Sequence, residues 1–315
     1  MASTLQLPVI DLSSPDRIGT AQSIRQACME FGFFYLINHG VEQSLVGEVF
    51  ERSREFFSLS EAEKMKLLHK RHRGYSPLYD EKLDPSVISK GDSKESFYIG
   101  PLELSDLNQW PSEENLPSWK ATMETYYKRV MNAGKKLAPM IALALNLDED
   151  FFDKAGALNP AEGFLRLLHY PAVHVGPLGT SDRLVYGASA HSDYGMLTLL
   201  MTDGVPGLQV CREKLRQPQI WEDVPYLSGA FIVNIGDLTE RWTNCLFQST
   251  LHRVMPTGSE RFSIAFFLDP NPDCLVECLE SCCTESSPCR FPPIRAGDYL
   301  EERLRATFSD PNIKI

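Results

Sequence analysis

The stretch that decides the fold is LRLLHY at residues 165–170, the first of several short apolar runs that follow Gly163. Turn residues such as Asp203-Gly204 and Thr257-Gly258 separate these runs. Short strands at this rhythm are typical of an antiparallel sandwich or barrel. The second half of the chain is therefore predicted to be mainly β, with strands over residues 165–170, 184–188, 196–201, 208–211, 230–235, 251–255 and 262–268.

Upstream of these strands, helical and strand patterns alternate. Ser14 and Pro15 predict a helix start, with an N-cap followed by proline at the first helical position. Ser60 and Glu63 form a capping box that predicts a second start. Pro139 is expected to kink or break the longest helix. The predicted elements are strands over 7–11, 33–37 and 94–99 and helices over 43–57, 61–68, 119–147 and 297–308.

The length of 315 residues allows two domains. However, no low-complexity linker separates the helical half from the β half, so we expect the first half to pack on the second. Residues 1–115 are predicted to form a mixed N-terminal region. Residues 116–315 are predicted to form the long helix, the β core and a C-terminal helix. Both regions are expected to belong to one integrated unit.

Composition and charge exclude several classes of function. The chain has 43% hydrophobic residues, and its 42 acidic residues exceed its 31 basic residues, giving a net charge of −11. An acidic protein is a poor partner for nucleic acid or an anionic membrane. The longest apolar run, residues 137–145, is too short to span a bilayer. No signal peptide is recognised at the start, so we expect a cytoplasmic protein. We also expect it to be a monomer.

Eight cysteines are then expected to stay reduced, as in other cytosolic proteins. Five of them lie close together at positions 274, 278, 282, 283 and 289. None of these has the CxxC spacing of a zinc knuckle, so the favoured interpretation is a cysteine-rich surface segment.

Candidate metal ligands lie in the β half. His191 and Asp193 stand two apart on an extended segment and therefore point to the same side. Such a pair is common by chance, but His252 follows 59 residues after Asp193, at the start of another predicted strand. Two histidines and one carboxylate on adjacent strands form the facial triad of non-haem Fe(II) oxygenases, which leaves positions open for other ligands.

A candidate anion site follows His252. Arg261 and Ser263 share one strand face, and a guanidinium group matches a carboxylate with two parallel hydrogen bonds. Arg261 alone would suggest a surface ion pair. Beside a metal site in a β core, it suggests an acidic small-molecule ligand.

With these motifs in this order, the chain resembles the plant-type 2-oxoglutarate/Fe(II)-dependent dioxygenases, the group that includes isopenicillin N synthase. The resemblance covers nearly the whole chain. It rests on LPVID at 7–11, GFFYLINHG at 32–40, YP at 170–171, AHSDYG at 190–195, GLQV at 207–210, VNIGD at 233–237, LHRV at 251–254 and RFS at 261–263. The fold it implies is an α+β protein with a double-stranded β-helix, or jelly roll, flanked by helices.

The resemblance also implies roles for residues. His191, Asp193 and His252 would bind Fe(II) and carry the catalysis. Arg261, Ser263 and Tyr170 would hold the cosubstrate 2-oxoglutarate, which is converted to succinate as O2 is consumed. Ascorbate is the expected supporting reductant.

One departure from the family pattern concerns the cosubstrate. Leu168 stands where the family often has asparagine, so one polar contact is expected to be missing. Substrate contacts are predicted for Phe267, Phe97, Tyr98 and Arg166. The alternative for Arg166 is a structural ion pair, and each aromatic residue could be plain core.

The predicted function is oxidation of a small organic molecule, a specialised metabolite such as an alkaloid, phenolic or hormone. Hydroxylation is the default, with demethylation, desaturation or ring closure as variants. The alternatives are an Fe(II) oxidase that needs no 2-oxoglutarate, a zinc hydrolase with the same ligands, and a non-catalytic metabolite-binding protein. A zinc hydrolase would leave Arg261 and Ser263 without an evident role.

Overall fold

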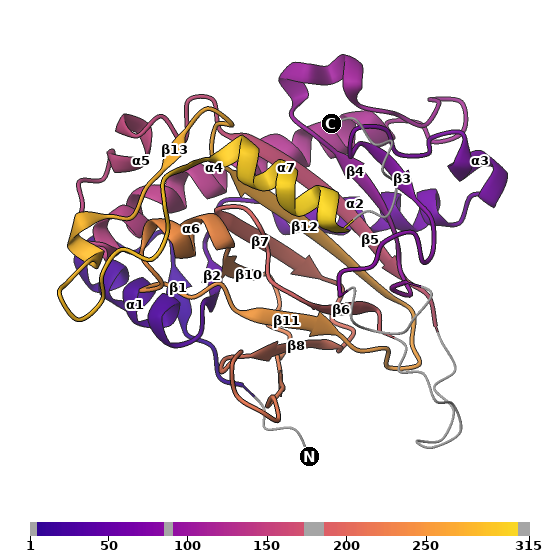
Figure 1. Cartoon of the computed structure of the whole chain (residues 1–315). Coiled ribbons are helices and arrows are strands. Elements are labelled where there is room, and N and C mark those ends of the chain that lie inside the picture. Colours follow the sequence, from indigo (N-terminus) through magenta and orange to yellow (C-terminus); the bar gives the residue numbers. More distant parts are fainter. Residues whose placement is uncertain (1–4, 85–90, 173–185, 308–315) are drawn as a thin grey trace.

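The computed structural model describes residues 5–84, 91–172 and 186–307. Helices, two larger β-sheets and one two-stranded sheet make up this part of the chain (Figure 1). In chain order the elements are β1 (Val9–Asp11), α1 (Arg17–Glu30), β2 (Phe33–Ile37), α2 (Gln43–Phe57), α3 (Glu61–Met65), β3 (Gly74–Ser76), β4 (Glu95–Ile99), η1 (Leu102–Leu107), α4 (Trp119–Ala144), α5 (Phe151–Lys154), β5 (Glu162–Tyr170), β6 (Ala188–His191), β7 (Leu197–Thr202), β8 (Leu208–Cys211), β9 (Glu222–Asp223), β10 (Phe231–Ile235), α6 (Asp237–Trp242), β11 (Leu251–Val254), β12 (Arg261–Asp269), β13 (Leu275–Val276), η2 (Glu280–Cys282), β14 (Ile294–Arg295) and α7 (Ala296–Thr307).

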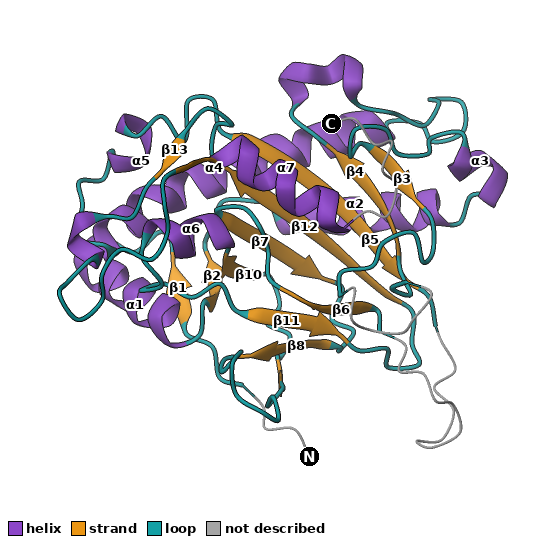
Figure 2. Ribbon diagram, in the orientation of Figure 1, coloured by secondary structure: helices purple, strands orange, loops and turns teal. Residues whose placement is uncertain are grey.

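Two sheets form the β core, as the jelly-roll prediction requires. The large sheet has the order β1-β2-β10-β7-β12-β5-β4-β3, and the small sheet has the order β6-β11-β8-β9. Figure 2 shows the helices gathered around the large sheet, with the small sheet to one side of it. The front of the chain supplies β1 to β4 and so extends the large sheet at both edges. The division at residue 115 stays a prediction.

Side chains along β12 point alternately to the hydrophobic core and to a cavity, so the large sheet separates the two. Phe262, Ile264 and Phe266 are buried in the main hydrophobic core, which includes much of α4. Arg261 and Ser263, at the alternate positions, face a cavity between the two sheets. Side chains of a strand point to opposite faces in turn, so one strand serves both regions.

Most of the predicted elements are confirmed, with corrections at their ends. Helix α1 is capped by Asp16, whose carboxylate accepts a hydrogen bond from the Gly19 N–H at 2.9 Å, so the Ser14 cap was wrong. The Ser60 cap is confirmed. Helix α4 continues through Pro139 to Ala144, so the predicted break within it was wrong. The strand predicted over 184–188 lies partly outside the described residues, and β6 begins at Ala188.

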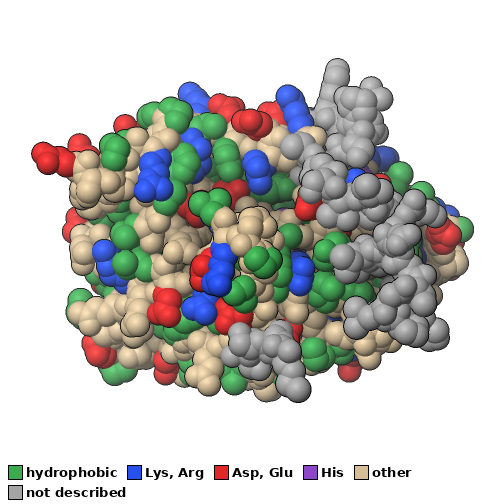
Figure 3. All heavy atoms as spheres, turned by 60° about the horizontal axis from the view of Figure 1, so that its bottom comes forward, with side chains coloured by type: hydrophobic (Ala, Val, Ile, Leu, Met, Phe, Trp, Pro, Cys, Tyr) green, Lys and Arg blue, Asp and Glu red, His purple; other side chains and the backbone are tan. Residues whose placement is uncertain are grey.

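The surface agrees with the mixed charge of the sequence. On the face seen in Figure 3, acidic and basic side chains are interspersed. Among the described helices, none combines the length and the apolar character needed to cross a membrane.

Candidate active site

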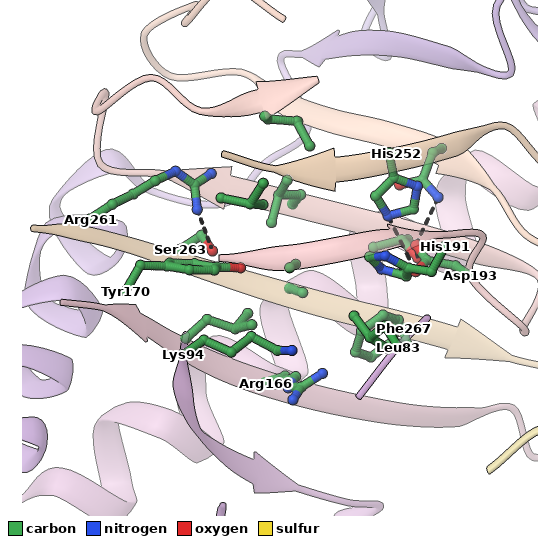
Figure 4. A pocket seen from close by; sticks show the side chains of 18 of the residues that line it. Leu83, Lys94, Arg166, Tyr170, His191, Asp193, His252, Arg261, Ser263 and Phe267 are labelled. Carbon is green, nitrogen blue, oxygen red and sulfur yellow. Dashed lines mark hydrogen bonds and ion pairs between the residues drawn. The ribbon is translucent and has the colours of Figure 1, made fainter. Parts of the chain in front are cut away.

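A cavity lies between the two sheets (Figure 4). Strands β5, β7, β10 and β12 of the large sheet line one side, and β6, β8 and β11 of the small sheet line the other. The front of the chain adds Leu83 and Lys94 to the lining. Three polar groups of residues occupy different parts of this cavity, which we call the metal-ligand end, the arginine end and the front wall.

The metal-ligand end consists of His191 on β6, His252 on β11 and Asp193 just after β6. Asp193 Oδ1 lies 3.8 Å from His191 Nε2 and 3.6 Å from His252 Nε2. The two histidines are partners in the β6–β11 ladder, which explains why their rings meet. The structure thus brings together three candidate ligands that are separated by as many as 61 positions in the sequence.

Hydrogen bonds outside the group fix the direction of each ligand atom. His191 Nδ1 lies 2.7 Å from the Ser189 carbonyl, and His252 Nδ1 lies 3.1 Å from the Thr250 carbonyl. Each Nδ1 is therefore placed to donate its proton to a carbonyl, which leaves the Nε2 lone pair facing the partner ligands. This outer set of contacts is typical of protein metal sites.

The carboxylate is oriented in a similar way. Asp193 Oδ2 accepts hydrogen bonds from Thr198 Oγ1 at 2.6 Å and from Asn234 Nδ2 at 2.8 Å. Oδ1 is left to face the two imidazoles. One oxygen is therefore held by the protein and the other is presented to a cation.

The protonation states suit metal binding. Burial and the nearby His252 lower the pKa of His191 to about 4, so its imidazole is neutral near pH 7. Burial opposes ionisation of Asp193, but the two histidines and the two hydrogen bonds to Oδ2 lower its pKa overall. Two imidazoles and one carboxylate are the facial donor set of Fe(II).

The arginine end is formed by a buried cation, Arg261, and its neighbours Ser263 and Tyr170. Arg261 is 3% exposed, donates from Nη1 to Ser263 Oγ at 3.3 Å and from Nε to the Val205 carbonyl at 3.2 Å, and lies over the Tyr170 ring. Among the described residues, no carboxylate forms an ion pair with it. A buried guanidinium without a counter-ion favours an anionic ligand, and the cavity gives such a ligand room.

The front wall is a buried ion network that the sequence did not reveal. Lys94 Nζ lies 2.8 Å from Glu81 and 2.8 Å from Asp92, while Arg166 Nη2 lies 2.7 Å from Glu81. The cations raise the acidity of Glu81, whose pKa lies well below its usual range despite burial. Asp92 also accepts hydrogen bonds from the N–H and hydroxyl of Ser189, at 3.0 and 2.5 Å. The network therefore ties the front of the chain to β6, two residues from His191.

Arg166 is held by contacts to three residues, Glu81 among them. Its Nη2 also donates to Ser96 at 3.0 Å, and its guanidinium lies over the Tyr98 ring. Its Nε, also buried, has no hydrogen-bond partner among the described residues. Arg166 lines the cavity and also forms an ion pair with Glu81, and its contact with a substrate stays a prediction.

The residues predicted to contact the substrate differ in whether their side of the strand faces the cavity. Phe267 lines the cavity. Phe97 does not, because it lies in the main core against Phe56 and Trp119, so its prediction as a substrate contact was wrong. Tyr98, on the other face of β4, packs on Arg166 but is not part of the cavity lining either. Two adjacent strand residues face opposite sides, so they could not both have lined one cavity.

The residue that replaces the family asparagine also reaches the cavity. Leu168 lies on its lining and offers no hydrogen bond there. Lys94, Leu83, Thr198 and Asn234 belong to the site although sequence reasoning assigned them no role. Only Asn234 carried a signal, since it falls within the VNIGD motif at 233–237.

Comparisons with known proteins agree with this geometry. Residues 7–113 match the family model of the non-haem dioxygenase N-terminal region, described from morphine synthesis, and residues 161–270 match the 2OG-Fe(II) oxygenase superfamily. Kihadalactone A synthase LFS of Citrus sinensis is 41% identical, over 96% of this chain and 93% of its own length.

Solved structures show the same likeness. A full-length Neurospora crassa protein, solved in complex with alpha-KG and thymine, is 31% identical, with a TM-score of 0.83 over 95% of this chain and 96% of that one. JOX2 in complex with 2OG, Fe and JA is 26% identical, with a TM-score of 0.78 over 98% of this chain and 91% of its own.

Proposed function

The chain belongs to the 2OG-Fe(II) oxygenase superfamily and is an oxidoreductase, and we propose that it uses Fe(II), 2-oxoglutarate and O2 to oxidise a small organic metabolite. The observation that supports this most is the pairing within one cavity of a His/Asp/His group and a buried arginine without a counter-ion among the described residues. The first group suits Fe(II), and the second suits a dicarboxylate that reaches from the metal to the far end.

The His/Asp/His group has the role of holding the metal. His191 and His252 offer Nε2, and Asp193 offers Oδ1, each already oriented by hydrogen bonds on its other side. Fe(II) bound there would supply the redox chemistry that couples O2 to oxidation of a C–H bond. Three protein ligands on one side leave the cavity side free for small molecules.

The arginine end has the role of binding the distal carboxylate of 2-oxoglutarate. Arg261 would pair with it, while Ser263 and Tyr170 would donate hydroxyl hydrogen bonds. Leu168 adds only apolar surface here. We therefore expect binding of the cosubstrate to depend on Arg261 more strongly than on any other single side chain.

The front wall and Phe267 have the role of contacting the substrate. Phe267 and Leu83 present apolar surface, whereas Arg166 and Lys94 place cationic side chains on the lining. A substrate with an apolar skeleton and at least one oxygen acceptor matches this wall. We propose a specialised metabolite of that kind, with hydroxylation as the default outcome and ascorbate as the supporting reductant. A monomer in the cytoplasm remains the simplest proposal for the acting species.

The test is a screen of metabolite extracts with purified protein, Fe(II), O2 and labelled 2-oxoglutarate. We expect release of labelled succinate coupled to loss of one metabolite, and Arg261→Leu should abolish that coupling at low cosubstrate concentration. Metabolite loss that needs no 2-oxoglutarate would favour the oxidase alternative. Turnover with zinc in place of iron would favour the hydrolase. Metabolite binding without any turnover would favour a binding protein.

A further inference from the structure

A second group of metal-ligating side chains lies outside the cavity. Cys278, Cys283 and Cys289 belong to the segment between β13 and β14, and their sulfur atoms all lie within 4.8 Å of one another. None of these residues lines the cavity. All three are free cysteines, so their sulfurs are thiols.

The fold holds this segment in place through one buried side chain. Asn244, which is 3% exposed, donates from Nδ2 to the carbonyls of Cys282, Ser287 and Pro288 at 3.2–3.3 Å. Its Oδ1 accepts a hydrogen bond from the Arg290 N–H at 3.0 Å. The segment is thus wrapped around a side chain from the end of α6, and the three sulfurs are brought together by this arrangement rather than by a short sequence motif.

Without a cation the surroundings of the sulfurs favour thiols, because Cys278 Sγ donates to the Arg241 carbonyl at 3.3 Å and Cys289 Sγ donates to the Phe291 carbonyl at 3.2 Å. Backbone N–H groups of Phe291 and Arg290 lie close to the Cys278 sulfur, where they favour the charged form. Burial and the adjacent Cys289 act the other way and raise the pKa of Cys278. Burial and the neighbouring cysteines likewise raise the pKa of Cys283, and a bound cation would favour the thiolate form of both residues.

We propose that Cys278, Cys283 and Cys289 form a surface site for one thiophilic divalent cation, such as Zn²⁺. Zn–S bonds of about 2.3 Å in tetrahedral geometry place sulfurs about 3.8 Å apart, so the group has to close by at most about 1 Å. Each Cys S–H bond gives way to a metal–sulfur bond, and up to three protons are released. The fourth position is left to water or to an outside ligand.

The proposed site has a structural consequence that does not depend on catalysis. A bound cation would link residues 278, 283 and 289 and so fix the segment against Asn244. Helix α6 begins at Asp237, whose N–H donates to the Asp193 carbonyl at 2.8 Å. The cation would therefore stabilise a region that supports the loop of a candidate iron ligand.

The experiment is a Co²⁺ titration of the full-length, metal-free, reduced protein. Co²⁺ bound to thiolates gives a sulfur-to-metal charge-transfer band, whereas the His/Asp/His group has no sulfur and cannot give one. We expect the band to saturate at one equivalent, to disappear on addition of Zn²⁺, and to be accompanied by proton release. Binding of the cation should also raise the melting temperature.

Substitutions then locate the site. Cys278→Ser, Cys283→Ser and Cys289→Ser should each weaken Co²⁺ binding at least 100-fold, whereas Cys245→Ser, a half-buried control beside Asn244, should leave it unchanged. His191→Ala should remove metal from the cavity and leave the charge-transfer band intact. Absence of the band in the reduced protein, or its persistence in the triple serine variant, would overturn the proposal and would leave the proposed oxidation untouched.

Discussion

The metal-ligand end and the front wall of the cavity are held by different kinds of interaction. At the metal-ligand end, His191 and Asp193 are oriented by near neighbours, the Ser189 carbonyl and the Thr198 hydroxyl. At the front wall, Lys94 and Arg166 are held by ion pairs to Glu81, which lies 85 positions from Arg166. Contacts between near neighbours predominate at the metal-ligand end, with Asn234 as a long-range exception, whereas long-range ion pairs hold the front wall. We expect changes in the front wall that keep the contact of Asp92 with Ser189 to leave the metal-ligand end undisturbed.

The largest expected effect comes from breaking the metal-ligand end. Asp193→Ala removes the only carboxylate of the group, and we expect kcat/KM to fall by at least about 1000-fold, equivalent to about 4 kcal/mol. Bound iron and turnover measured on the same samples check this. Thr198→Ala removes one of the two hydrogen bonds to Asp193 Oδ2 and should lower metal affinity by about 10-fold. Equal losses of bound metal and turnover in the two variants would contradict the view that Asp193 binds the metal and Thr198 only orients Asp193.

Breaking the front wall should affect stability first. Glu81→Gln leaves two buried cations with Asp92 as their remaining buried anion, and we expect the free energy of unfolding to fall by about 3 kcal/mol. Denaturant unfolding measures this. Glu63→Gln, in the exposed pair with Lys66, is the matched control and should change stability by less than about 0.5 kcal/mol. A similar small change in Glu81→Gln would mean that the network contributes little.

The arginine end should show a loss of cosubstrate affinity with little loss of stability. Arg261→Leu removes a charge-assisted contact, and we expect the KM for 2-oxoglutarate to rise about 100-fold, or about 3 kcal/mol. Arg261→Lys should recover part of this, because the charge returns without the fork geometry. Steady-state kinetics at saturating substrate would reveal an unchanged KM if the assignment were mistaken.

An effect that appears only when the pH is raised is expected at a buried carboxylate that lacks the cations of the front wall. Burial raises the pKa of Asp269 to about 7, and its Oδ1 has no hydrogen-bond partner among the described residues. The folded state therefore holds a proton that the unfolded state releases near pH 4, so this contribution to stability falls as pH rises from 4 to 7.

Asp269→Asn should remove this pH dependence. We expect the variant to be more stable than the parent by up to about 4 kcal/mol at pH 8 and to match it near pH 4. Denaturant unfolding across this pH range gives the comparison. Parallel stability curves for the two proteins would show that Asp269 is already ionised in the folded state.

Much of the candidate site could be predicted from residue types and from the rule that alternate residues of a strand share a face. The ligands of the metal-ligand end are chemically distinctive, and β12 places Arg261, Ser263 and Phe267 on one face as the period of two requires. The ends of helices were less certain, because Ser14 and Asp16 are both good caps and only the backbone geometry decides between them.

The remainder depends on contacts that no local pattern encodes. Glu81 and Asp92 look like ordinary loop residues until the fold brings them to Lys94 and Arg166. The three clustered cysteines have spacings of five and six positions, and Asn244 brings them together from outside their segment. Phe97 was assigned to the cavity because composition does not reveal which face of β4 is the inner one.

His252 pairs directly with His191 across the β6–β11 ladder. Metal binding at these two residues therefore requires the correct alignment of the two strands. A slip of one residue would turn one imidazole out of the cavity, because side chains alternate between faces. The metal would then bind and stabilise only the chain whose strands are correctly aligned. The final stage of folding would therefore depend on the supply of the metal. The residues between Asp193 and His252 can change in number without harm, provided that insertions fall in loops and leave this alignment intact.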